Sequence, residues 1–175
     1  MDAPFLNPKV LINTSLGDII VEVYEAKAPI TSRNFFRYIY RGLYNGTTFF
    51  RTVTLDNQPN NEVKIEVIQG GMVAKEKRLP SIEHEPTYKT GLKHIDGAVS
   101  MARGAPGTAS SSFFICIGDQ LELDYGGLRN PDEQGFAVFG QVVEGMDIVR
   151  NIHMQPCEGQ KLTTPIEIVK IQRKK

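Results

Sequence analysis

The chain has few of the residues that build disulfide-stapled domains. Among its 175 residues there are two cysteines, three histidines and no tryptophan. Cys116 lies in an apolar segment and Cys157 in a segment with proline and glycine. Two cysteines make no framework of disulfides, so we expect both to be thiols. His153 lies near Cys157, but nothing around the two supplies the oxyanion hole or the orienting group of a catalytic cysteine.

Metal and phosphate motifs are also lacking. Glu83-His84-Glu85 is followed by His94, and this spacing matches neither His-Glu-x-x-His nor another helical pair of ligands. We therefore expect ordinary surface residues here and no metal. The loop at residues 104–112 has no Gly-Lys-Ser/Thr, which disfavours a phosphate-binding loop, and the absence of Gly-x-Ser-x-Gly removes the common hydrolase motif.

An excess of charge of one sign is missing as well. Twenty Lys and Arg balance twenty Asp and Glu, so the molecule offers no basic field for nucleic acid. The basic tail Arg173-Lys174-Lys175 has no interleaved aromatic residues, and we expect it to be solvated. No apolar run approaches about 18 residues and no signal-like segment begins the chain. We expect a soluble, cytoplasmic protein without a membrane partner, unless the chain is the trimmed form of an exported one.

Short alternating segments separated by turns dominate the sequence. A chain of this length supports one core that buries roughly 70% of the unfolded surface, and we expect one domain at residues 10–172 after an extension at residues 1–9. Helices are expected from Pro29 to about Gly42 and over residues 144–152. The expected strands cover residues 10–14, 19–25, 49–53, 63–69, 98–102, 113–117, 136–142 and 165–172. This pattern predicts a mostly β fold, a closed eight-stranded antiparallel barrel capped by two α-helices.

Arg51 is the most unusual residue, because it stands in the apolar run Thr48-Phe49-Phe50-Arg51-Thr52-Val53. Strand parity would place its guanidinium beside Phe49 and Val53. From this residue alone, two interpretations remain open. Either a carboxylate such as Asp56 or Glu66 holds a structural arginine, or the arginine is a polar group above an apolar pocket that binds a ligand.

Two further segments favour the second interpretation. Val67-Ile68-Gln69-Gly70-Gly71-Met72 ends a strand with an amide and two glycines. Ser100-Met101-Ala102-Arg103 leads through the loop at 104–112 into Phe113-Phe114-Ile115-Cys116-Ile117. Together with Arg51, and in this order, these segments resemble the cyclophilin family of peptidyl-prolyl cis/trans isomerases from about Val10 to Ile171. The chain is identified as a divergent, bacterial-like member of that family.

The resemblance implies a monomeric enzyme that assists protein folding by accelerating rotation about X-Pro bonds, without a cofactor. Arg51 would be the catalytic residue and Gln69 would hold the backbone of the substrate. Ala102 and Arg103 would offer backbone contacts to a proline-containing polypeptide. The residues expected to line the proline pocket are Val67, Phe114 and Leu123. The alternative is a module that binds proline-containing segments with little catalysis, and the retained Arg51 favours the enzyme.

Several positions depart from the residues that the family commonly has. Within the expected substrate site these are Phe50 for histidine, Glu66 for a pocket phenylalanine, Ser112 for glutamine and Phe136 for the histidine or tyrosine of the rim. Glu66 would bring a carboxylate near Arg51. Glu122 replaces the tryptophan whose indole commonly donates a hydrogen bond to cyclosporin, so we expect weak or no cyclosporin binding. Two insertions, residues 54–62 and 128–134, would flank the site and supply contacts or restrict which peptides enter.

Overall fold

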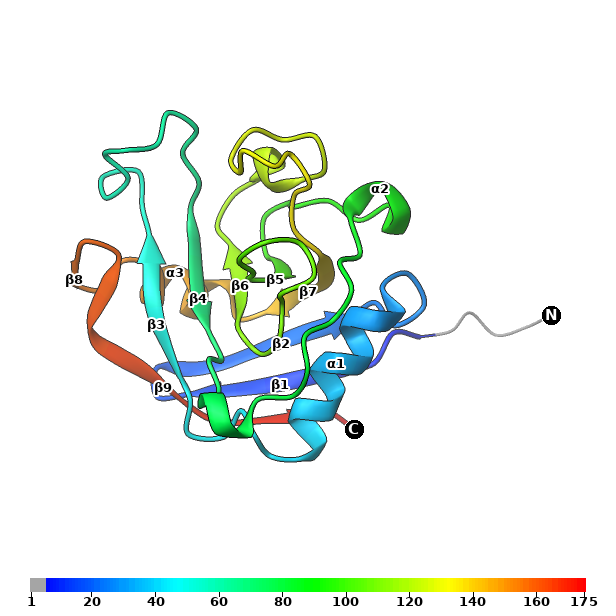
Figure 1. The fold of residues 1–175 in the computed structure, drawn as a ribbon. Coiled ribbons are helices and arrows are strands. Elements are labelled where there is room, and N and C mark those ends of the chain that lie inside the picture. Colours follow the sequence, from blue (N-terminus) through cyan, green and yellow to red (C-terminus); the bar gives the residue numbers. More distant parts are fainter. Residues whose placement is uncertain (1–5) are drawn as a thin grey trace.

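The computed structural model describes residues 6–175 (Figure 1). The first five residues of the expected N-terminal extension lie outside the described residues. The strands are β1 (Lys9–Thr14), β2 (Gly17–Val23), β3 (Thr48–Val53), β4 (Val67–Gly70), β5 (Ala98–Met101), β6 (Phe113–Cys116), β7 (Val138–Glu144), β8 (Cys157–Glu158) and β9 (Lys161–Arg173). The helices are α1 (Pro29–Tyr40), α2 (Thr87–Thr90) and α3 (Met146–His153), with 3-10 turns η1 (Lys75–Lys77) and η2 (Leu121–Leu123).

Eight of the strands close into a barrel. They follow the order β1-β2-β7-β5-β6-β4-β3-β9, and β9 returns to pair with β1. Every neighbouring pair is antiparallel. The short β8 forms a hairpin with the beginning of β9. The predicted eight-stranded antiparallel barrel is therefore confirmed, and α2 is a third helix that the sequence pattern did not predict.

Aromatic side chains fill the interior of the barrel. Phe35 of α1 packs against Phe113 and Phe139, with ring centroids 5.7 and 4.9 Å apart, and Phe49 meets Phe113 at 5.9 Å. All four rings are fully buried. Because neighbouring residues of a strand face opposite sides, Phe114 points outward where Phe113 points inward. This arrangement explains why β6 is apolar on both faces.

Two residues expected at the surface are buried. The Glu85 carboxylate accepts hydrogen bonds from the backbone N–H groups of Ile30 at 3.2 Å and Thr31 at 2.7 Å, at the start of α1. The residue before α1 is Ala28, which has no side chain for capping, so Glu85 satisfies these donors and meets the positive end of the helix dipole. His94 is fully buried too. The surface prediction is wrong for both residues, because Thr31 lies 54 residues from Glu85 and Asp124 lies 30 residues from His94.

The structure also shifts several of the expected boundaries, two of which bear on the site and on the basic tail. β4 begins at Val67 rather than at residue 63, and residues 54–66 form a loop. This loop rises from the same end of the barrel as the loop before β7 (Figure 1). β9 continues to Arg173, whose guanidinium donates to the Tyr40 hydroxyl at 3.1 Å and lies 5.5 Å from the centre of the Phe36 ring. The first residue of the predicted basic tail is therefore the exposed last residue of β9. Within residues 6–175, no helix combines the length and the apolar character needed to cross a membrane.

Candidate active site

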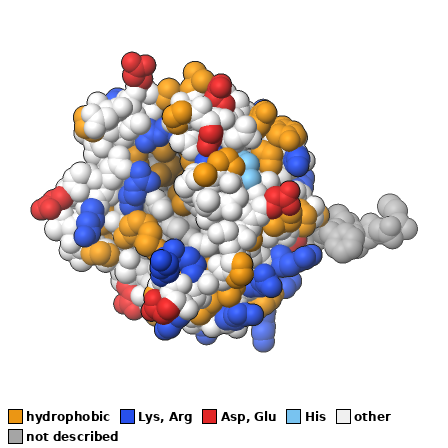
Figure 2. Space-filling view, in the orientation of Figure 1, with side chains coloured by type: hydrophobic (Ala, Val, Ile, Leu, Met, Phe, Trp, Pro, Cys, Tyr) orange, Lys and Arg blue, Asp and Glu red, His pale blue; other side chains and the backbone are white. Residues whose placement is uncertain are grey.

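A cavity of about 560 Å³ opens between the loop at 54–66 and the loop that leads into β7. Figure 2 shows the hollow on this face, with apolar side chains inside it and Lys or Arg side chains at its edge. Arg51 and Gln69 line one side, and Ala102 and Arg103 border the other. The apolar members expected from the sequence are Val67, Phe114, Leu123 and Phe136, and all four line the cavity.

A β-bulge at Phe50 turns Arg51 toward this cavity. In the pairing of β3 with β4, Phe49 faces Gly70 and Arg51 faces Gln69, so Phe50 is one extra residue. The bulge shifts the alternation of side chains by one position. Phe49 is fully buried in the barrel, whereas Arg51 and Gln69 line the cavity. The prediction that Arg51 lies beside Phe49 is therefore wrong, and Phe50 itself does not line the cavity.

Two neutral amides hold the guanidinium of Arg51. Its Nε and Nη2 donate to Oε1 of Gln160 at 3.0 and 2.6 Å, and its Nη1 donates to Oε1 of Gln69 at 2.8 Å. Among residues 6–175, no carboxylate lies within ion-pair distance of Arg51. The interpretation of a structural arginine held by Asp56 or Glu66 is therefore wrong.

The charge of Arg51 faces the cavity without being neutralised. Its hydrogen bonds to residues 6–175 use three of the five N–H groups of a guanidinium, and the other two can serve a ligand. Burial and, second, the charge of Arg129 lower the pKa of Arg51. Arginine still keeps its proton at neutral pH. A partly desolvated positive charge of this kind interacts more strongly with polar groups than it would in water.

Ser112 acts behind Gln69 and does not line the cavity. Its Oγ accepts a hydrogen bond from Nε2 of Gln69 at 3.0 Å and donates to the carbonyl oxygen of Gly70 at 3.2 Å. These bonds fix the Gln69 amide with its oxygen toward Arg51. The direct substrate contact expected of Ser112 is thus replaced by a positioning contact.

The floor of the cavity is apolar and rigidly supported. Val67, Phe114 and Leu123 are at most 5% exposed. Phe136 meets Phe114 edge to face, with ring centroids 5.4 Å apart. The buried imidazole of His94 is stacked on Phe114 at 5.9 Å with an interplanar angle of 8°. Such a floor suits a compact apolar ring whose polar bond lies at the edge, near Arg51.

His94 is held as a neutral imidazole. Its Nδ1 lies 2.7 Å from Oδ1 of Asp124, and its Nε2 lies 2.9 Å from the hydroxyl of Ser100. Burial lowers the pKa of His94 and outweighs the hydrogen bond and charge of Asp124, which raise it. In the neutral ring, Nδ1–H donates to Asp124 and Nε2 accepts from Ser100. The contact with Asp124 is therefore a hydrogen bond rather than an ion pair.

Glu66 faces away from the cavity. Its neighbours Ile65 and Val67 both line the cavity, and alternation sends the side chain between them to the other side. There Glu66 lines a separate hollow with His153. The prediction that Glu66 brings a carboxylate near Arg51 is wrong, and Ile65 supplies the apolar wall instead.

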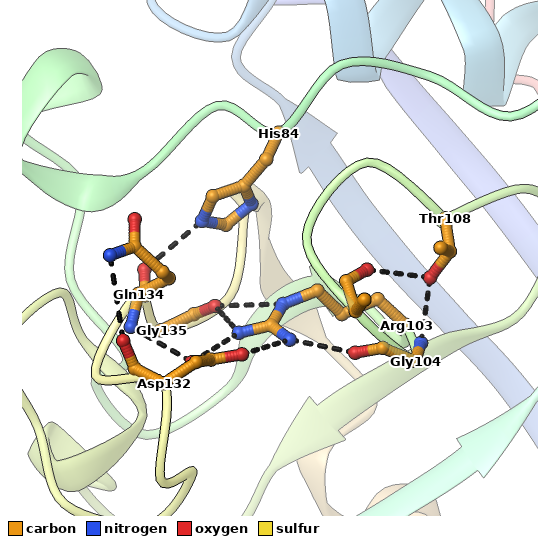
Figure 3. A network of polar contacts seen from close by, with 8 residues as sticks. His84, Arg103, Gly104, Thr108, Asp132, Gln134 and Gly135 are labelled. Atoms are coloured by element: carbon orange, nitrogen blue, oxygen red, sulfur yellow. Dashed lines mark hydrogen bonds and ion pairs between the residues drawn. The ribbon is translucent and has the colours of Figure 1, made fainter.

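Arg103 borders the cavity, but its charge is paired. Its Nη1 and Nη2 lie 3.0 and 3.1 Å from the carboxylate oxygens of Asp132, and its Nε and Nη2 donate to the carbonyl of Gly135 at 3.0 and 2.6 Å (Figure 3). The Arg103 side chain is 2% exposed and lies 4.6 Å from the centre of the Phe136 ring. The hydrogen bond from Arg103 lowers the pKa of Asp132. This side chain therefore anchors the insertion at residues 128–134.

Gln58 and Arg129 join the two insertions into one wall. Gln58 is 1% exposed, and its Nε2 donates to the carbonyls of Thr54 at 2.6 Å and Ile65 at 2.7 Å. Arg129 donates from Nη1 to Oε1 of Gln58 and to the carbonyl of Val63, each at 2.7 Å. Both insertions thus flank the cavity, as the sequence predicts, and they are tied to each other.

Residues 9–173 match the family model of the cyclophilin type peptidyl-prolyl cis-trans isomerase/CLD. The chain belongs to the cyclophilin family. A peptidyl-prolyl cis-trans isomerase of Acinetobacter baylyi is 35% identical over 168 residues, which cover 94% of this chain and 83% of that protein. Peptidyl-prolyl cis-trans isomerase B of Escherichia coli is 36% identical over 146 residues, 82% of each chain. The crystal structure of a Cryptosporidium parvum cyclophilin in the presence of the dipeptide Ala-Pro shares the fold, with a TM-score of 0.74 and 22% identity over 95% of this chain and 99% of that one.

This cyclophilin is a peptidyl-prolyl cis/trans isomerase, as the resemblance predicts. Sequence reasoning missed two residues of its candidate site. Gln160 stands 109 residues from Arg51, in the turn between β8 and β9, and nothing in its neighbourhood marks it. Arg129 lies in the insertion at 128–134. A cationic residue in a loop expected to flank the site was the one signal that could have identified it.

Proposed function

We propose that Arg51 is the catalytic residue of this cyclophilin and that it acts on X-Pro bonds in extended, proline-containing polypeptides. One observation carries the proposal. The guanidinium stands beside an apolar floor, oriented by Gln69 and Gln160, and it keeps N–H groups for a ligand.

Rotation about an X-Pro bond is slow because resonance holds the amide planar. The barrier is about 18–20 kcal/mol, and unassisted exchange takes roughly 10–100 s. As the bond twists, resonance is lost and the lone pair of the prolyl nitrogen becomes a hydrogen-bond acceptor. Arg51 donates to that nitrogen, and neither planar isomer offers the same acceptor. The twisted state is therefore bound more tightly than either ground state.

The rest of the cavity holds the substrate around this bond. The floor of Val67, Phe114 and Leu123 takes the pyrrolidine ring and excludes water from the twisted amide. Gln69 and Ala102 line the cavity, and we assign them contacts with the peptide backbone. An acceleration of about 10⁴ to 10⁶ needs only about 5.5–8 kcal/mol of differential binding. A charge-assisted hydrogen bond formed in a dry site, together with a fixed ring, is of that order.

The proposal extends to the oligomeric state and to the binding of cyclosporin. The chain acts as a monomer, since its own Arg51, Gln69 and Phe114 already line the cavity together. Cyclosporin binds weakly, because Glu122 is exposed and its Oε2 already accepts a hydrogen bond from the backbone of Leu128 at 2.8 Å. A carboxylate at this position also offers no donor to a largely apolar macrocycle.

Exchange spectroscopy on a short X-Pro peptide tests the proposal. The wild type should accelerate cis/trans exchange without changing the isomer ratio. Arg51→Ala should lower kcat/KM by about 100-fold, roughly 2.7 kcal/mol, while the protein stays folded. Arg51→Lys should restore little, because an ammonium lacks the planar fork of the guanidinium.

Two outcomes would contradict the assignment. A folded Arg51→Ala variant within about threefold of wild type, roughly 0.65 kcal/mol, would remove Arg51 from the reaction. A wild type that binds the peptide but leaves its exchange rate unchanged would be a binding module rather than an isomerase.

A further inference from the structure

Two arginines, Arg51 and Arg129, line the same cavity, and within residues 6–175 neither has a carboxylate at ion-pair distance. The acceptors of Arg51 are two glutamine oxygens. Those of Arg129 are Oε1 of Gln58 and the carbonyl oxygen of Val63. All of these acceptors are neutral, so both positive charges remain without compensation.

No acidic side chain of residues 6–175 lines the cavity, and three acidic residues of the neighbouring segments are placed as follows. Asp132 is paired with Arg103. Glu122 accepts a hydrogen bond from the backbone of Leu128 and does not line the cavity. Glu66 lines the separate hollow on the other side of the strand. The lining of the cavity therefore carries positive charge and no acidic side chain.

Arg129 has the larger number of free donors. Both hydrogens of its Nη1 are used, whereas its Nε and Nη2 groups make no hydrogen bond to residues 6–175. These three N–H groups form a planar fork, the geometry that suits the oxygens of a carboxylate or a phosphate. Burial lowers the pKa of Arg129, and the charge of Arg129 contributes to the lowered pKa of Arg51. An anion bound to Arg129 would relieve this repulsion and leave Arg51 free for the amide nitrogen.

We propose that Arg129 makes this groove selective for proline-containing segments that carry an anionic side chain next to the proline. The group recognised is a carboxylate or a phosphate, supplied by an acidic residue or by a phosphorylated serine or threonine. The ring lies on the floor of Val67, Phe114 and Leu123, and the anion lies against Arg129. The inference rests on the proposed function, since it concerns which X-Pro bonds are presented to Arg51.

Matched peptides test this selectivity. One pair of peptides carries Glu or Gln immediately before the proline, and a second pair carries Glu or Gln immediately after it. A third and a fourth pair carry phosphoserine or serine at the same two positions. The ratio of kcat/KM within a pair should favour the anionic peptide by roughly five- to tenfold in at least one position, about 0.95–1.4 kcal/mol, which is the net contribution of one typical hydrogen bond. The ratio should fall as salt rises from about 0.05 to 0.5 M, because partly exposed charges are screened. A preference for Glu identifies acidic segments as the ligand, and one seen only with phosphoserine identifies phosphorylated segments.

Variants then assign the selectivity to Arg129. Arg129→Gln should bring the ratio close to one, and Arg129→Lys should keep part of it, because the charge remains without the fork. Each ratio is taken within one variant, so a general loss of activity from a looser wall cancels. Arg33→Gln is the matched control, since it removes the same charge from an exposed position of α1 outside the cavity and should leave the ratio unchanged.

The inference is overturned if every wild-type ratio stays within about twofold, or if the ratio survives in Arg129→Gln. If no peptide exchanges faster, the proposed function fails instead. Dissociation constants of the same pairs, measured by titration calorimetry, then still decide whether Arg129 selects the anion.

Discussion

At the scale of single residues, the site depends on how one guanidinium is held. A carboxylate partner would neutralise Arg51, whereas the amide oxygens of Gln69 and Gln160 orient it and leave its charge intact. Gln160 is itself fixed, because its Nε2 donates to the carbonyl of Asn57 at 3.1 Å. Neutral acceptors of this kind suit a cation that must interact with a substrate rather than with its own protein.

Gln160 is a positioning residue, and its removal should lower activity without unfolding the protein. Gln160→Ala should reduce kcat/KM about tenfold, roughly 1.4 kcal/mol, because two of the three bonds that orient Arg51 are lost. Gln160→Glu should also reduce it, since a carboxylate keeps the geometry but pairs with the charge. Exchange spectroscopy and urea unfolding of the same samples measure both effects.

Gln155→Ala is the control for these variants. Gln155 lies in the turn before β8, and its side-chain amide donates to two oxygens of Asn151 rather than to a group of the site. Its replacement should leave kcat/KM unchanged. Wild-type activity in both Gln160 variants would show that Gln69 alone suffices to orient Arg51.

At the scale of elements, the two insertions behave as one wall of the groove. The insertion after β3 is organised by the buried Gln58, and the one before β7 reaches it through Arg129. The second insertion is held from its other end by the pairing of Arg103 with Asp132. Loops usually vary in position, but these are tied to each other and to the barrel.

Gln58→Ala should loosen this wall more than it disturbs the barrel. The change leaves the carbonyls of Thr54 and Ile65 and the N–H of Ile65 without their buried partner. We expect a loss of about 2–3 kcal/mol in unfolding free energy and faster hydrogen exchange at Ile65. Gln134→Ala is the control, because the side-chain amide of Gln134 makes an exposed hydrogen bond to the carbonyl of Asp132. This variant should lose less than about 0.5 kcal/mol of unfolding free energy. Equal stability of the two variants would show that Gln58 does not organise the insertion.

At the scale of the whole molecule, closure of the barrel brings distant segments into one site. β3, β4 and β6 are neighbours in the sheet and present Arg51, Gln69 and Phe114 on one outer face. Buried polar residues stabilise the arrangement from behind. Glu85 bonds to the start of α1, and His94 supports Phe114.

The buried His94 should make stability depend on pH. Burial lowers its pKa in the folded state below the value of about 6.5 that it has in the unfolded chain. The unfolded chain then binds more protons, so the His94 contribution is complete above about pH 6.5 and is lost as pH falls toward the folded pKa. Urea midpoints measured from about pH 8 to pH 5 should decrease over this window.

His94→Asn should be less stable than the wild type at every pH. Its urea midpoint should also decrease less between about pH 8 and pH 5. His84→Asn is the control, because His84 is only partly buried and bonds to the carbonyl of Gln134. Parallel curves for wild type and His94→Asn would show that another group causes the pH dependence.

The sequence by itself determined the barrel, the apolar floor and the presence of Arg51 at the candidate site. Local alternation of apolar and polar residues predicts the strands, and an arginine in an apolar run can be recognised from the sequence alone. The same local rule failed at Phe50, where a bulge reverses the face of Arg51, and at Glu66, where the neighbouring loop changes which side chains point into the groove.

Only the tertiary structure decided which groups hold Arg51, support Phe114 and cap α1. Gln160 reaches Arg51 across 109 residues, Asp124 meets His94 across 30, and Glu85 meets Thr31 across 54. A hydrogen bond between such segments produces no periodic pattern in the sequence of either one, because the two groups meet only after the barrel has closed. Local pattern therefore predicts the elements and their apolar faces, and the closed fold decides which polar partners meet.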